Sequence, residues 1–200
     1  MRKVGPEYPI LQSARLRLRP FASEDIPEVN RLVGDCDVAR PLIAVDYPYS
    51  EDDARRWIVK HQPGYEESGS LNFAVERRED GALVGFIGIG GNGSQAGMGY
   101  WYGKPFWGNG YATEAGCTTL AFSFEEIRLQ RVEASHLSSN RASGRVLQKM
   151  GMYFVGRNPY YYPKWDKHCD KDEYAITRAD YQKVCAEAPD HYCYQRLAPS

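Results

Sequence analysis

Residues 100–115 read YWYGKPFWGNGYATEA, and this stretch contains signals for a strand, a turn and a helix. It starts as an aromatic strand, passes through a loop with Gly108 and Gly110, and continues into an amphipathic helix that starts near Ala112. Glycines let a backbone approach a ligand and turn its N–H groups toward one point, and a helix N-terminus adds the positive end of its dipole. The stretch therefore predicts a site for a pyrophosphate, while the glycines alone fit a plain strand-to-helix turn equally well.

Apolar periodicity predicts the elements on both sides of this stretch. A period of two indicates strands, and recurrence at three and four residues indicates helices. Asp80-Gly81 favours a tight hairpin turn, Ser50 and Asp53 form a capping box, and Gly151 suits a left-handed residue after a helix. The expected strands are residues 14–19, 72–76, 83–89, 97–102, 131–136, 152–156 and 173–177, and the expected helices follow Ser23, Ser50, Gly110 and Asn140. This order predicts an α/β protein with a mixed, mostly antiparallel sheet of about seven strands flanked by helices.

Length and composition limit the functional classes. A chain of 200 residues is the size of one domain, and its net charge of -1 gives no attraction to nucleic acid. No apolar run approaches the roughly 20 residues of a membrane span, and residues 1–9 lack the apolar region of a signal peptide. The five cysteines are scattered without a metal-site spacing, so we expect reduced thiols and no metal. Together these features predict a cytoplasmic protein with neither membrane nor nucleic acid as partner.

Residues 88–93, GIGGNG, form a competing motif. They match the dinucleotide pattern G-x-G-x-x-G and follow an expected strand, which raises the hypothesis of a nicotinamide-dependent oxidoreductase. That pattern requires a helix directly afterwards, but residues 97–102 predict another strand. We therefore interpret residues 88–97 as a hairpin connection.

Several motifs in order resemble the GCN5-related N-acetyltransferase (GNAT) superfamily. They are WGNGYATEA at 107–115, RVEA at 131–134, NRAS at 140–143 and VLQKMGM at 146–152. The opening ARLRLRPF at 14–21 resembles the RimJ/RimL-like branch, named for ribosomal-protein N-terminal acetyltransferases. The resemblance predicts a GNAT domain over residues 10–178 and leaves 179–200 as a C-terminal extension, with a helix expected at 179–187.

The resemblance implies an acetyl-CoA site between two splayed strands. The first strand would bind the pantetheine arm through its backbone, and the glycine loop would bind the pyrophosphate. Phe106 stands where the family usually has Arg or Gln, so any contact of that side chain is in doubt. The implied cofactor-binding residues are Tyr100, Trp101, Tyr102, Trp107, Gly108, Asn109, Gly110, Tyr111, Ala112, Thr113, Asn140 and Ser143.

Ser143 and Tyr102 are the candidate catalytic residues. The resemblance implies that Ser143 donates a proton to the departing thiolate, but it also fits a hydroxyl on the helix surface. Asn140 fits both a contact with pantetheine and a helix cap. A base must also deprotonate the amine, and Glu76, Glu133, His136 and a tyrosine acting through water all stay open as candidates.

These inferences predict an N-acetyltransferase that moves the acetyl group of acetyl-CoA to a primary amine in a ternary complex. The acceptor is a peptide N-terminus or a small-molecule amine, and a homodimer would agree with the resemblance. Residues 160–162, Lys164 and Trp165 fit either an acceptor-shaping segment or a packed surface loop. A catalytically silent acyl-CoA-binding regulatory module is the alternative function.

Overall fold

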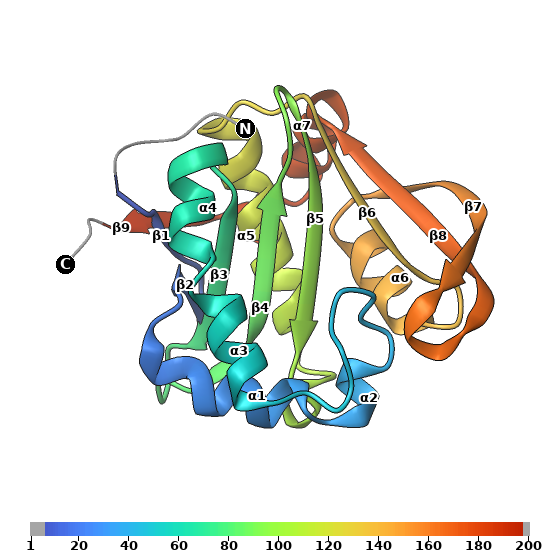
Figure 1. Cartoon of the computed structure of the whole chain (residues 1–200). Helices are drawn as coiled ribbons and strands as arrows, with labels where there is room; N and C mark the ends of the chain where they lie inside the picture. The colour runs from blue at the N-terminus through green and yellow to red at the C-terminus, as the bar shows by residue number, and fades with distance from the viewer. Residues whose placement is uncertain (1–6, 198–200) are drawn as a thin grey trace.

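The computed structural model describes residues 7–197 and arranges them around one nine-stranded sheet (Figure 1). The strand order is β7-β8-β6-β5-β4-β3-β2-β1-β9, and β5 pairs with β6 in parallel while the other neighbours pair antiparallel. The strands are β1 (Ile10–Gln12), β2 (Leu16–Pro20), β3 (Leu71–Arg77), β4 (Leu83–Gly90), β5 (Gln95–Tyr102), β6 (Arg131–Leu137), β7 (Tyr153–Tyr162), β8 (Lys167–Thr177) and β9 (Gln195–Leu197).

Helices cover both faces of the sheet. The first four, in front in Figure 1, are α1 (Ile26–Val33), α2 (Cys36–Ala39), α3 (Glu51–Ile58) and α4 (His61–Ser68). The others are α5 (Tyr111–Glu125), which packs behind the sheet on β2, β4 and β5, α6 (Arg141–Lys149) and α7 (Arg178–Glu187). No helix among residues 7–197 has the length and apolar character needed to cross a membrane.

The local signals produce the expected elements. Ser50 and Asp53 form the capping box at the start of α3. Gly81 and Gly151 both have positive φ, at the β3–β4 turn and after α6 respectively. Because β4 leads through a short turn into β5 rather than into a helix, the dinucleotide interpretation of residues 88–93 lacks its essential helix.

The structure corrects three boundaries. The sheet has nine strands rather than about seven, because β1 and β9 are three-residue strands that pair with each other. Residues 160–165, for which a packed surface loop was one interpretation, belong to a long β7–β8 hairpin. The helix expected after Ser50 is followed directly by a second helix, α4. In each case pairing or packing with distant residues stabilises a segment whose own sequence has weak periodicity.

The C-terminal residues pack on the same core. Tyr181 on α7 and Tyr192 are about 95% buried, at 5% relative exposure each. The hydroxyl of Tyr192 donates to the carbonyl of Met150, at 3.0 Å, just after α6. The segment after residue 178 thus supports α6 and, through β9, extends the sheet beside β1.

An aromatic cluster under α3 and α4 encloses a histidine. The rings of Phe21, Trp57 and Phe86 surround His61, which is 7% exposed. Burial lowers the pKa of His61 to about 4. The folded protein therefore holds this imidazole in its neutral form.

We expect this histidine to make stability depend on pH. An unfolded histidine has a pKa of about 6.5, so between pH 6.5 and 4 the unfolded chain binds the proton more readily. The contribution of neutral His61 to the free energy of unfolding is fully present above about pH 6.5, and about 2 kcal/mol of it is lost by about pH 4.5. Denaturant unfolding at pH 7 and pH 4.5 should show this loss in the wild type and a smaller loss in His61→Gln. Equal losses of unfolding free energy in the two proteins would contradict this role of His61.

Candidate active site

The strands β5 and β6 separate part-way along their length. Their pairing covers Gln95, Ala96 and Gly97 of β5, whereas β5 continues to Tyr102 and β6 to Leu137. Figure 1 shows the two strands together at the top of the view and apart toward the bottom. Among the described residues no strand pairs with this side of β5 beyond Gly97, so backbone N–H and C=O groups there are available to an extended ligand.

A turn rich in unpaired N–H groups lies at the open end of this gap. Gly108 and Gly110 have φ of +79° and +80°, in the left-handed region that favours glycine. The first backbone bond of α5 runs from Glu114 N–H to the Gly110 carbonyl. Within residues 7–197 no acceptor is paired with the backbone N–H groups of residues 108–113. This turn can therefore bind an anion such as a pyrophosphate.

Arg15, directly before β2, holds this turn in place. Its Nε donates to Glu114 Oε2 at 2.7 Å, and Nη1 donates to the Asn109 carbonyl at 3.0 Å. Ser13 Oγ also donates to Glu114, at 2.8 Å. Because Glu114 lies in the first turn of α5, Arg15 also offsets a negative charge that would repel an anion.

Other loop side chains make contacts that stabilise the turn. Asn109 Nδ2 donates to the carbonyls of Phe106 and Trp107, each at 3.2 Å, and Trp107 Nε1 donates to the Tyr102 carbonyl at 2.7 Å. The guanidinium of Arg77 lies 5.5 Å from the centre of the Phe106 ring. Phe106 therefore has a packing role at the position of the expected Arg or Gln.

The aromatic side chains of β5 alternate between the faces of the sheet. Trp101 packs in the core of the α1–α3 face, while Tyr100 and Tyr102 lie toward α5 and α6. The Tyr102 hydroxyl is buried and has no hydrogen-bond partner among the described residues, and burial raises its pKa well above the ordinary value. Tyr111 is also in the core, so it can offer a ligand its backbone N–H while its ring packs inside.

Asn140 and Ser143 lie at the start of α6, beside the gap. Asn140 Oδ1 accepts from the Ser143 N–H at 3.2 Å, which confirms the helix-cap interpretation of Asn140. Ser143 Oγ lies 2.8 Å from the hydroxyl of Tyr100 across the gap. The start of α6 thus lies across the gap from the end of β5.

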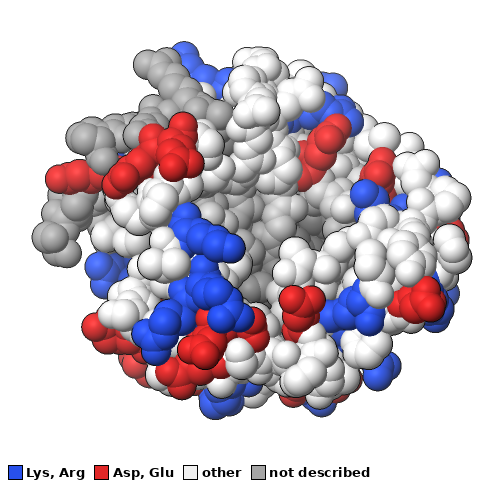
Figure 2. All heavy atoms as spheres, in the orientation of Figure 1, with Lys and Arg blue, Asp and Glu red and all other residues white. Residues whose placement is uncertain are grey.

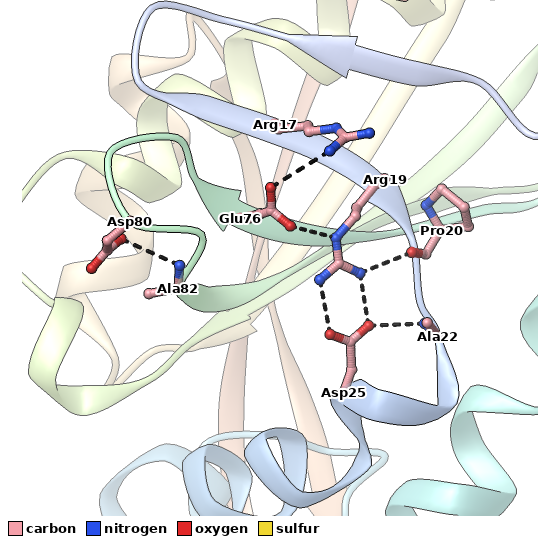
Figure 3. A network of polar contacts seen from close by, with 8 residues as sticks. All are labelled: Arg17, Arg19, Pro20, Ala22, Asp25, Glu76, Asp80 and Ala82. Carbon is pink, nitrogen blue, oxygen red and sulfur yellow. Dashed lines mark hydrogen bonds and ion pairs between the residues drawn. The ribbon is translucent and has the colours of Figure 1, made fainter. Parts of the chain in front are cut away.

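Of the candidate bases, Glu76 is held in a structural network (Figure 3). Arg19 Nε donates to Glu76 at 2.7 Å, and the same guanidinium makes a two-pronged pair with Asp25 at 2.7 and 2.8 Å. Arg17 adds a longer ion pair at 3.9 Å. Because guanidinium groups contact both oxygens of this carboxylate, the network favours a structural role for Glu76.

The other two candidates lie on β6, on opposite faces. Glu133 is exposed and paired with Arg131 at 2.8 Å. His136 is 7% exposed, and its Nδ1 lies 2.8 Å from the Leu137 carbonyl, which can only accept. Nδ1 therefore donates to this carbonyl, and Nε2 is buried without a hydrogen-bond partner among the described residues.

The face of the sheet opposite α5 and α6 contains a cavity. A cavity of about 230 Å³ opens beside Gly97 and Glu133, where β5 and β6 part. Figure 2 shows this face hollowed near its middle, with acidic and basic side chains around the hollow. Residues 39–47 contact the tip of the β7–β8 hairpin.

The sequence did not predict the contact between residues 39–42 and the tip of the β7–β8 hairpin. The Tyr162 hydroxyl donates to the Leu42 carbonyl at 2.9 Å, and Lys164 Nζ donates to the Ala39 carbonyl at 2.8 Å. These bonds join segments more than a hundred residues apart. The tyrosine and lysine run at 160–165 was the available signal, but it does not identify the backbone carbonyls that it contacts.

Comparisons with known proteins agree with this geometry. A family model described as "Acetyltransferase (GNAT) domain" matches residues 15–153. The protein named "Uncharacterized N-acetyltransferase YoaA" of Bacillus subtilis is 27% identical over 174 residues, covering 86% of this chain and 98% of that protein.

Two solved structures show the same fold. The GNAT-family acetyltransferase from Bacillus anthracis has a TM-score of 0.76 and 26% identity, covering 85% of this chain and 99% of that one. Mycobacterium smegmatis RimJ in complex with CoA-disulfide has a TM-score of 0.76 and 23% identity, covering 94% and 97% respectively, and at this identity the likeness is one of fold.

Proposed function

Because this chain belongs to the GNAT acetyltransferase family, we propose that it transfers the acetyl group of acetyl-CoA to a primary amine by direct attack in a ternary complex. The acceptor is a peptide N-terminus or a small-molecule amine. The observation that carries the proposal is the gap between β5 and β6, which opens beside the unpaired N–H groups of residues 108–113.

The described groups fit acetyl-CoA in size and chemistry. The unpaired edge of β5 suits the amides of an extended pantetheine arm, and the turn before α5 suits its pyrophosphate. The start of α6 lies beside the same gap, with Ser143 near the place where a thioester would lie. In this arrangement a backbone N–H of β5 supports the developing oxyanion, and Ser143 supplies a proton to the departing sulfur.

We further propose a branch of the family and a class of acceptor. The fold likeness to RimJ is compatible with the RimJ/RimL-like branch and therefore with a protein N-terminus as acceptor. The homodimer and the cytoplasmic location stay predictions.

Calorimetric titration tests the cofactor first, with acetyl-CoA and separately with NADH. Thiol release from acetyl-CoA is then followed with a peptide, an amino acid, a polyamine and an amine drug. We expect binding of acetyl-CoA and release with at least one amine. Binding without release would favour the silent acyl-CoA-binding module, and binding of NADH alone would overturn the proposal.

A further inference from the structure

Tyr100 and Ser143 form a hydrogen-bonded pair that bridges β5 and α6. The phenol oxygen lies 2.8 Å from Ser143 Oγ and 3.2 Å from the Ser143 backbone carbonyl. Tyr100 is on β5 beyond its last position paired with β6, so its side chain crosses the region where the two strands have separated. Both residues are partly buried, which restricts competition from water.

The pair can hold its protons in two ways. The carbonyl can only accept, so a phenol that donates to it leaves the Ser143 hydroxyl to donate to Tyr100. When the phenol instead donates to Ser143 Oγ, the serine proton is free to point at a third atom. Burial raises the pKa of Tyr100 to about 12, so the phenol keeps its proton at neutral pH and can act as this donor.

We propose that Tyr100 is a positioning residue that directs the hydroxyl proton of Ser143 toward the departing sulfur. The inference rests on the proposed function. It adds a role for the side chain of Tyr100, whereas the sequence predicted a contribution from the Tyr100 backbone alone. It explains why a single serine hydroxyl, which otherwise rotates freely, has a defined direction at this place.

The proton balance of the step is complete. The carbon–sulfur bond breaks and its electron pair passes to sulfur, which takes the proton from Ser143 Oγ. In concert, Ser143 Oγ takes up, through solvent, the proton that the amine nitrogen loses as the carbon–nitrogen bond forms. Tyr100 keeps its own proton in the hydrogen bond to Ser143 Oγ. The net change moves one proton from nitrogen to sulfur.

Thiol release from acetyl-CoA tests the inference. The nucleophile is the fastest amine of the screen or, if no amine reacts, water. We expect Tyr100→Phe to lower kcat about tenfold, since it removes one hydrogen bond in the transition state, and to leave calorimetric affinity for acetyl-CoA unchanged. Ser143→Ala should lower kcat at least as much. The double variant should match Ser143→Ala alone, because residues acting as a unit are not additive.

Tyr65→Phe is the matched control. It removes another buried phenol that donates to a backbone carbonyl, that of Glu7 at 3.0 Å, from helix α4. Its kcat should equal that of the wild type. A Tyr100→Phe variant as active as this control, or a double variant whose losses multiply, overturns the inference while leaving the proposed function intact. Wild-type protein that releases no thiol overturns both.

Discussion

Replacing Gly110 with tryptophan is expected to weaken acetyl-CoA binding more than about a hundredfold, or about 2.7 kcal/mol. Gly110 has a φ of +80° and is the residue directly before α5, so its conformation directs the following N–H groups. A Cβ at this position lies 3.5 Å from Arg15 Nη2, and an indole would therefore displace the guanidinium that holds the turn. Calorimetric titration of both proteins with acetyl-CoA measures the change.

Gly81→Trp separates this effect from backbone strain. Gly81 has nearly the same φ, +74°, but lies in the β3–β4 turn, where a Cβ would meet no neighbouring atom within 4 Å. Both substitutions force a bulky residue into the left-handed region, which costs about 1–2 kcal/mol of stability. Only Gly110→Trp should lose acetyl-CoA affinity. Equal affinities in the two variants would exclude the turn before α5 as the cofactor site.

The parts of the fold that sequence predicted are those with strong local signals. The capping box at Ser50 and the glycine at position 81 act within a few residues, and both elements form as expected. The strand, glycine turn and helix of residues 95–125 also follow local periodicity, although the helix starts at Tyr111, one residue before the expected position.

The missed parts depend on distant partners. β1 pairs with β9 across almost the whole chain, and a three-residue strand carries too little pattern to be found alone. Of β7, residues 153–156 were expected as a strand but residues 157–162 were not, because this edge strand has most side chains exposed on both faces and contains Pro159. Its pairing with β8 forms the strand nonetheless.

In the candidate site, too, the sequence predicted local features and missed contacts between distant residues. The motif at 140–143 predicted the residues at the start of α6, because a capping pattern is local. The contact of Arg15 with Glu114 spans 99 positions, and that of Tyr100 with Ser143 spans 43. No pattern within the sequence specifies which distant side chains meet, so these contacts became visible only in the structure.

Replacing Tyr192 with alanine is expected to lower the free energy of unfolding by about 4 kcal/mol. The ring is 5% exposed and packs edge-on against Tyr181, at 5.3 Å between ring centres. Its hydroxyl also satisfies the carbonyl of Met150 at the end of α6. Urea unfolding followed by circular dichroism measures the loss.

Two further variants divide that loss into its parts. Tyr192→Phe keeps the ring and removes the hydrogen bond to Met150, so it should cost about 1 kcal/mol. His191→Ala changes an exposed neighbour and should stay within about 0.5 kcal/mol of the wild type. If Tyr192→Ala were no less stable than His191→Ala, residues 179–197 would be a dispensable extension of the domain. The expected order of stabilities instead means that residues 179–197 belong to the core that holds α6, and with it Ser143, beside the gap.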